Sequence, residues 1–397
     1  MIPDMNTSPQ LSDRANALAV LRYQRQPADR LPVVHFGFWN ETLQKWAAEG
    51  HLTAELAQAW GDGNDADAEI GRRLGFDFNW YSCLHTHTTL RPGFAREVIR
   101  VLPDGSRHVR NGDGVVLLER PDAGSIPAEI EHLLTDRATW EQHYRHRYAW
   151  HDDRVDLATV RRSAGDWVPF AKGGADFLRA DRRDFPYGLH CGSLIGSIRN
   201  ILGVERLSYL VSDDLDLFEE IVATNADLCY RCVERVLASG AKFDFAHFWE
   251  DICYKSGPLV SPRVFAKVVG PHYRRITDLC TRHGIDIVSL DCDGKIDALL
   301  PTWLENGVNT MFPIEVGTWR ASIAPWREKY GKQVRGVGGM DKVVFSHDRA
   351  AVDAEIERLK PLVALGGFIP CPDHRIAPDA EWDTVRYYCE RMHAVFG

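Results

Sequence analysis

The sequence predicts an α/β fold in which eight short strands alternate with helices and close into a (β/α)8 barrel. Short apolar runs that end in polar or glycine residues recur along the chain, and amphipathic helical patterns separate most of them. Strands that alternate with helices form parallel βα units, and about eight such units are typical of a closed barrel. A doubly wound open sheet is the alternative, although no GxGxxG sequence follows a predicted strand.

The predicted strands and helices follow one another along a single domain, residues 1–397. The strands lie within residues 31–39, 75–81, 186–192, 243–250, 284–291, 309–315, 333–339 and 366–371. Apolar residues at helical spacing, with Ser or Asp at the start and Gly at the end, predict helices within residues 213–238 and 261–284. Shorter helices are expected within residues 295–307 and 349–367.

Residues 95–120, AREVIRVLPDGSRHVRNGDGVVLLER, interrupt this alternation. Their Asp-Gly and Asn-Gly-Asp-Gly sequences are typical of hairpin turns between antiparallel strands. We therefore expect an antiparallel β-meander of two or three strands, inserted between barrel elements.

The composition bounds the class of function. The chain has 397 residues, 45% of them hydrophobic, and a formal charge of -9, which argues against a nucleic-acid partner. No run reaches the roughly 18 apolar residues that span a bilayer, and the start lacks the pattern of a signal peptide. Nine cysteines in a chain of this size predict reduced thiols. We expect a cytoplasmic protein that acts on a small molecule, without a membrane partner. A homodimer is left open.

Polar residues at the ends of the predicted strands are the candidates for chemistry, because the loops after the strands build the active site of an α/β barrel. They form an acidic rim with several imidazoles, and the rim includes His35, Trp39, Cys83, His85, His87, His190, Glu250, Asp251, Asp291, Asp293, Glu315, Lys342 and His374.

Asp291 and Asp293 end the fifth predicted strand. Alternate residues of a strand face the same side, so the two carboxylates point together and repel each other unless a proton or cation lies between them. They either share a proton, hold a divalent metal with His374 or Glu250, or cap the helix that begins near Lys295.

Two other segments allow more than one interpretation. His85 and His87 form an HxH sequence that can supply two metal ligands, or they are exposed loop residues. His190 precedes residues 192–196, GSLIG, whose backbone amides are suited to a substrate carboxylate at a helix N-terminus.

The chain resembles the uroporphyrinogen decarboxylase superfamily in an ordered series of motifs. These are RYQRQPADRLPVVHFGFWNETLQKW (22–46), ExxxxKSGPLVSP (250–262), DCDG (291–294), LLPTWLENGVNTMFPIE (299–315), REKYG (327–331), GGMDK (338–342) and GGFIPCPDHRIAP (366–378). The resemblance implies a (β/α)8 barrel. The superfamily includes the haem-pathway decarboxylase and zinc-dependent methyltransferases that work with corrinoid proteins and a thiol acceptor.

The departures from the decarboxylase pattern argue against porphyrinogen decarboxylation. The decarboxylase has an arginine-bearing motif after its first strand, where this chain has HFGFWNET, and an aspartate after its second strand, where this chain has Cys83. The methyltransferase branch has His-x-Cys at the positions of Asp291 and Asp293, and a further Cys at that of His374. The resemblance therefore implies a divalent metal on these three residues. Zinc is favoured, with manganese, iron or magnesium as alternatives for oxygen-rich ligands.

Three hypotheses follow from the residues and the resemblance. The first is metal-assisted methyl or related group transfer on a small oxygen- or sulfur-containing substrate, with a corrinoid carried by a partner protein. The second is metal-free decarboxylation of a carboxylated substrate, and the third is a non-catalytic binding barrel. The catalytic candidates are His190, Glu250 and Asp251, and the substrate-binding candidates are His35, Trp39, Cys83, Trp249, Lys342 and Arg375.

Overall fold

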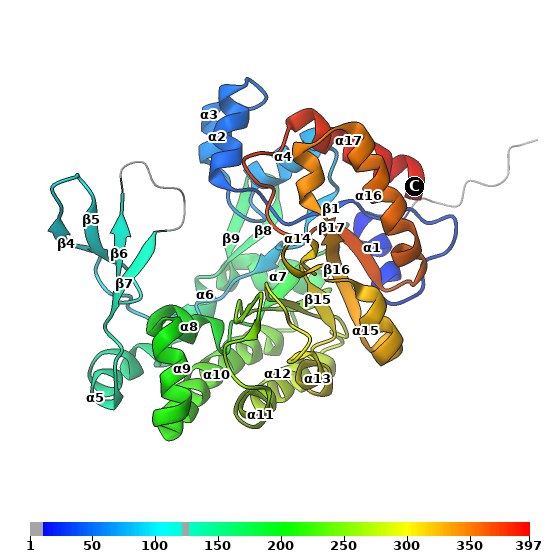
Figure 1. Ribbon diagram of the computed structural model, residues 1–397. Helices are drawn as coiled ribbons and strands as arrows, with labels where there is room; N and C mark the ends of the chain where they lie inside the picture. Colours follow the sequence, from blue (N-terminus) through cyan, green and yellow to red (C-terminus); the bar gives the residue numbers. More distant parts are fainter. Residues whose placement is uncertain (1–10, 121–126) are drawn as a thin grey trace, which may run out of the picture.

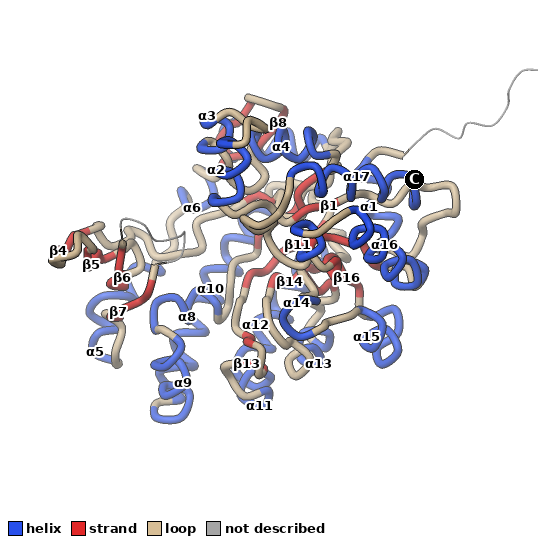
Figure 2. The backbone as a smooth tube through the Cα atoms, turned by 45° about the horizontal axis from the view of Figure 1, so that its top comes forward, coloured by secondary structure: helices blue, strands red, loops and turns tan. Residues whose placement is uncertain are grey.

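The computed structural model describes residues 11–120 and 127–397 and has an α/β fold around a mostly parallel sheet. Seven strands form this sheet in the order β17-β16-β15-β14-β11-β10-β3, and every neighbouring pair is parallel. The strands are β3 (Cys83–Leu84), β10 (Gly188–His190), β11 (Phe245–Trp249), β14 (Val288–Asp291), β15 (Thr310–Phe312), β16 (Arg335–Met340) and β17 (Phe368–Pro372). Helices surround the sheet in both views (Figures 1 and 2).

A second parallel pair lies at the edges of this sheet. β1 (Val34–His35) pairs with β2 (Phe78–Asn79), and β2 precedes β3 directly in the chain. A parallel bridge joins Phe38, just after β1, to Ile376, just after β17. Each of the eight segments predicted as strands therefore contains a parallel strand. Among the parallel strands of the described residues, only β3 lies outside the predicted segments.

Each of the four segments predicted as helical contains a helix. The longest, α10 (Leu215–Ala238), begins at Asp214, whose side chain accepts a hydrogen bond from the backbone of Leu217, and it buries Cys229 and Cys232 on its inner face. The other α-helices are α1 (Asp13–Leu21), α2 (Asn40–Ala48), α3 (Ala54–Gln58), α4 (Asp65–Leu74), α5 (Arg137–Thr139), α6 (Asp153–Asp156), α7 (Ala175–Ala180), α8 (Gly196–Leu202), α9 (Val204–Asp213), α11 (Pro262–Val264), α12 (Gly270–Arg282), α13 (Leu300–Glu305), α14 (Val316–Trp319), α15 (Ile323–Tyr330), α16 (Arg349–Ala364) and α17 (Trp382–Phe396).

Antiparallel strands are present where the sequence predicts the meander. They are β4 (Glu97–Val101), β5 (Arg107–Arg110) and β6 (Val115–Glu119), and β7 (Ala128–His132) adds a fourth strand beyond the predicted segment. This sheet projects from the body of the molecule, at the left of Figure 1. Two short antiparallel pairs complete the strands, β8 (Thr159–Ser163) with β9 (Asp166–Pro169) and β12 (Cys253–Tyr254) with β13 (Gly257–Pro258).

The other general predictions concern thiols and membranes. All nine cysteines are free and buried, as the odd count and the chain length predict. Among the helices within residues 11–120 and 127–397, none combines the length and the apolar character that crossing a membrane requires.

Candidate active site

Asp291 is the last residue of β14, in the middle of the parallel sheet. It is 4% exposed, and its carboxyl group is hydrogen-bonded to the hydroxyl of Tyr81, which follows β2. Burial, together with the neighbouring Asp293 carboxylate, raises the pKa of Asp291 well above its usual value. Asp291 is therefore a carboxyl group that favours its protonated form.

Asp293 contacts His374, which lies just beyond β17. Its Oδ2 is 3.3 Å from Nε2 of His374. The His374 ring stacks on Trp39, with 5.5 Å between the ring centroids and 13° between the planes. The structure thus brings together the acidic end of the fifth predicted strand, the imidazole beyond the eighth and the tryptophan after the first.

The three predicted metal ligands do not form a common site in this arrangement. Residues 11–120 and 127–397 contain no group of three or more His, Cys, Asp or Glu side chains that could hold a metal ion. A zinc site needs at least three protein donors that converge on one point. Here Asp291 is bonded to Tyr81, while Asp293 and His374 contact each other. The divalent metal stays a prediction from the sequence.

Arg375, predicted to bind substrate, already holds a carboxylate of the protein. Its Nη1 and Nη2 donate to Oδ1 and Oδ2 of Asp62 at 3.0 and 2.6 Å. The guanidinium group also lies 5.5 Å from the ring centroid of Phe36. Lys342 begins a 3-10 turn after β16, and its backbone amide donates to Asp373 at 3.2 Å. The Arg375 guanidinium, one of the two cations predicted to bind substrate, is therefore neutralised in place by Asp62.

Glu250 follows β11 and has a structural role. Its fully buried carboxylate accepts hydrogen bonds from the backbone amides of residues 194–196 at 2.8 Å each, and from the Tyr273 hydroxyl at 2.5 Å. The amides that we expected to receive a substrate carboxylate thus bind this side chain at the start of α8. Because its oxygens are occupied, Glu250 is not placed to transfer a proton to a substrate.

Three other predicted site residues have partners of their own. Asp251 forms an ion pair with Arg199 of α8, and its charge contributes to the raised pKa of Asp291. The ring of His35 packs between Phe38 and Phe76, and burial lowers its pKa to about 3. Cys83 is buried within β3, and burial raises the pKa of its thiol. Core packing, rather than substrate contact, accounts for His35 and Cys83.

Three imidazoles gather at the ends of β3 and β10 and in the middle of β11. The ring centroids of His85 and His190 are 4.5 Å apart, and those of His190 and His247 are 5.8 Å apart. The Tyr81 ring lies 4.9 Å from that of His247. Burial lowers the pKa of all three imidazoles, so the rings are uncharged near neutral pH. His87, the second histidine of the HxH sequence, is outside this group. His85 and His87 therefore do not form a pair of metal ligands here.

A cavity of about 290 Å³ opens beside the imidazoles. Tyr81 lines it and also bonds Asp291, so this residue connects the cavity to the buried acid. The lining residues are Tyr81, His85, Thr88, Thr89, Leu90, Asp113, Tyr148, His190, Ser193, Ser197, Asn200, Ile201 and Trp249. The predicted residues His190 and Trp249 are thus placed together at one site.

Sequence reasoning missed Tyr81, Asp62 and His247. Tyr81 ends a predicted strand, and His247 interrupts an otherwise apolar one. Both residues could therefore have been identified as candidates from the sequence. Asp62 lies in a loop before α4, and its partner Arg375 is 313 residues away in the sequence. No local pattern identifies that pair.

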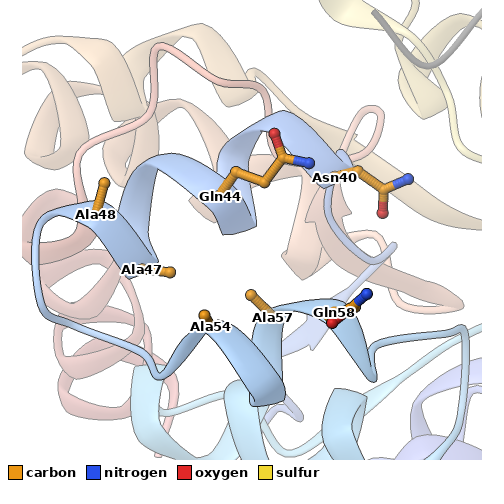
Figure 3. A pocket seen from close by; sticks show the side chains of 7 residues that line it. All are labelled: Asn40, Gln44, Ala47, Ala48, Ala54, Ala57 and Gln58. Atoms are coloured by element: carbon orange, nitrogen blue, oxygen red, sulfur yellow. The ribbon is translucent and has the colours of Figure 1, made fainter.

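A larger hollow, of about 590 Å³, lies on the surface between α2 and α3 (Figure 3). Its lining consists of alanines and side-chain amides: Asn40, Gln44, Ala47, Ala48, Ala54, Ala57 and Gln58. None of these side chains titrates or acts as a nucleophile, so the chemistry of the molecule is expected at the Asp291 side of the sheet.

Comparisons with known structures agree with this fold. A methyltransferase from Methanosarcina mazei has a TM-score of 0.56 at 13% sequence identity, over 98% of this chain and 100% of that one. A B12-independent methionine synthase from Shewanella sp. W3-18-1 has a TM-score of 0.45 at 13% identity, over 92% and 98% of the two chains. At 13% identity the first similarity shows the fold alone. The second has a TM-score below 0.5, so no inference is based on it.

Comparison of the sequence with families is more specific. No curated protein matches the chain. The family model described as uroporphyrinogen decarboxylase (URO-D) matches residues 194–395, just over half of the chain. This segment holds β11, β14, β15, β16 and β17, and with them Glu250, Asp291, Asp293 and His374. The chain therefore belongs to the uroporphyrinogen decarboxylase family.

Proposed function

We propose that the parallel strands close into a (β/α)8 barrel and that the chain is one domain with the antiparallel sheet inserted. The bridge between Phe38 and Ile376 supports closure on one side, and the continuity of β2 and β3 supports it on the other. Closure makes Asp291, Tyr81 and His374 neighbours at one mouth of the barrel, where such enzymes carry their active sites.

We propose that the protein transfers a methyl or related one-carbon group of a small, uncharged, oxygen-containing substrate. The observation that carries the proposal is the bonded pair of Asp291 and Tyr81, a buried acid whose partner reaches the cavity. Membership of the family and the methyltransferase-like fold support an enzyme of this type.

In this reaction the bond between the methyl carbon and the substrate oxygen breaks, and the methyl group bonds to a nucleophilic acceptor. The electron pair stays on the oxygen, which must take a proton to leave as a hydroxyl group. Asp291 supplies this proton through the hydroxyl of Tyr81, so that the Asp291 carboxylate remains. General acid catalysis of this kind contributes about 10²–10⁴-fold to a rate.

A corrinoid on a partner protein would supply the acceptor, as the family resemblance implies. The residues of this chain bind the substrate and move the proton. No step is assigned to the predicted divalent metal, because Asp291, Asp293 and His374 do not form a three-donor site here.

Decarboxylation is the competing reaction, and the Arg375 pair argues against it. A carboxylated substrate needs an available cation, whereas the Arg375 guanidinium is held in a bidentate ion pair by Asp62. An uncharged substrate needs no such partner.

Methyl transfer from 2-methoxyphenol to free reduced cobalamin tests the proposal. We expect the wild-type protein to release 1,2-dihydroxybenzene, and Asp291→Asn to lower the rate by about 10²–10⁴-fold. The product is measured by chromatography.

Asp278→Asn is the matched control, because Asp278 is an exposed residue of α12 with a partner at 3.9 Å. An unchanged rate in Asp291→Asn, or release of CO₂ from 2-methoxybenzoate without methyl transfer, would contradict the proposal. A wild-type protein that turns over neither compound would favour the non-catalytic barrel.

A further inference from the structure

The cavity beside the imidazoles contains hydrogen-bonding groups but lacks cationic side chains. Hydroxyl groups line it at Thr88, Thr89, Ser193 and Ser197, and Asn200 adds an amide. No lysine or arginine is among its lining residues. Its carboxyl group is Asp113, whose pKa is raised by burial. An anionic ligand would therefore lose its hydration without gaining a charged partner, which is costly.

Two arginines are bonded to residues in or beside the cavity lining. Arg154 is buried, and its guanidinium donates to the backbone oxygens of His87 and Thr89 at 2.7 and 2.8 Å. Arg199 pairs with Asp251. These contacts shape the loop of residues 87–89 and the start of α8, and they leave the interior of the cavity uncharged.

His190 presents a hydrogen-bond donor of fixed position. Its Nδ1 accepts a hydrogen bond from the backbone amide of Gly192 at 3.1 Å. A neutral imidazole that accepts at one nitrogen carries its proton on the other, so Nε2 of His190 is the donor. The ring of His85, 4.5 Å away by centroid, forms the adjacent wall.

His247 lies behind the lining of the cavity and is a second, independent observation beside it. It is 0% exposed, and neither of its ring nitrogens has a hydrogen-bond partner among the residues that the structure describes. The ring packs against Tyr81 and His190, both of which line the cavity. A buried polar group without a partner is costly, and a polar ligand reaching this ring would remove that cost.

We propose that this cavity binds an uncharged, single-ring aromatic molecule that carries hydroxyl or ether oxygens. Tyr81, Tyr148 and Trp249 supply aromatic walls, and His190 and Asn200 supply hydrogen bonds to the oxygens. The volume of about 290 Å³ is at the lower end of ligand sites and suits one substituted ring. The inference rests on the proposed function, whose substrate class it names, but binding can be measured without turnover.

Isothermal titration calorimetry with two matched probes tests the inference. 2-Methoxybenzyl alcohol and 2-methoxybenzoate share a ring and a methyl ether and differ in charge. We expect the alcohol to bind the wild-type protein at least tenfold more tightly than the benzoate. Asn200→Leu, which keeps the size of the side chain but removes its amide, should weaken binding of the alcohol at least tenfold. His85→Leu should do the same through the imidazole wall.

Gln44→Leu is the control variant, because Gln44 lies in the separate surface hollow between α2 and α3 (Figure 3). It should bind the alcohol like the wild type. Equal or tighter binding of the benzoate, or unchanged binding in a folded Asn200→Leu protein, would overturn the inference. Selective binding of the alcohol without methyl transfer would leave this site standing and contradict the proposed function. Methyl transfer that is unaffected by Asn200→Leu would contradict this binding site and leave the proposed function standing.

Discussion

Glu250 and Asp291 are buried carboxyl groups at the ends of neighbouring strands, and their surroundings differ. The backbone amide of Glu250 donates to the carbonyl oxygen of Asp291 at 2.8 Å, so the two residues lie side by side. The Glu250 carboxylate is surrounded by donors from residues 194–196 and Tyr273. The Asp291 carboxyl group is bonded to Tyr81 and faces the charge of Asp293.

This difference separates a structural acid from the acid to which the proposed function assigns proton transfer. A carboxylate that accepts several hydrogen bonds holds the donors in place and is stable where it lies. A buried carboxyl group beside a like charge retains a proton that it can give away. Burial raises the pKa of Glu250 as well, so burial alone does not distinguish the two acids. They differ in that four hydrogen bonds occupy the Glu250 oxygens, whereas Asp291 is bonded to Tyr81, which reaches the cavity.

The largest expected effect is loss of stability in Glu250→Ala. The substitution leaves the three backbone amides at the start of α8 and the Tyr273 hydroxyl buried without their partner. Unpaired buried groups of this kind cost about 3–5 kcal/mol in total, so the free energy of unfolding should fall by that amount. Urea denaturation followed by circular dichroism measures the change.

Asp291→Asn is the matched comparison for stability. The Asn side chain can still accept a hydrogen bond from Tyr81, and the repulsion from Asp293 is removed. We expect the free energy of unfolding to stay within about 1 kcal/mol of the wild type. If the two substitutions destabilised the protein equally, the distinction between the two acids would fail.

Much of the fold could be predicted because its signals are local. Short apolar runs such as residues 284–291 end in polar residues at the point where the strand ends, and each predicted segment contains a strand. The fourth antiparallel strand, AEIEH, was missed although it alternates apolar and acidic residues, because the predicted meander ended at residue 120.

The roles of the acidic residues could not be predicted, because they depend on distant partners. Glu250 binds amides that lie 54 to 56 residues earlier, and Arg375 pairs with an aspartate 313 residues away. The sequence indicated which residues lie at the ends of the parallel strands, but by their position alone Glu250 and Asp291 are equivalent candidates. Hydrogen-bond donors from other elements make the difference.

Asp67 is a third buried carboxyl group. Its ionisation should make the free energy of unfolding depend on pH. Burial raises its pKa from 3.8 to about 7, although Trp60, Gly63 and Asn79 donate hydrogen bonds to it. Its folded pKa lies above its unfolded pKa, so the folded protein binds the extra proton between these values. Stability contributed by this proton is present below about pH 4 and is lost as the pH rises toward 7.

Asp67→Asn should therefore flatten the stability profile between pH 4 and pH 7. One proton contributes a slope of at most about 1.4 kcal/mol per pH unit. Urea denaturation at pH 4.5, 5.5, 6.5 and 7.5 gives the slopes for both proteins. Parallel profiles would show that Asp67 ionises in the folded protein much as it does in the unfolded chain.

A small effect is also expected for His374→Ala, at the partly exposed end of the acidic group. The side chains of His374 and Asp293 are 21% and 29% exposed, so their contact contributes less than about 1 kcal/mol. Loss of stacking on Trp39 adds a similar amount. The free energy of unfolding should fall by about 1 kcal/mol, far less than in Glu250→Ala. Elemental analysis of the same samples tests the predicted metal: a stoichiometric metal in the wild type that is lost in His374→Ala would mean that Asp291, Asp293 and His374 rearrange to share an ion, and the assignment of Asp291 as a proton donor would then fail.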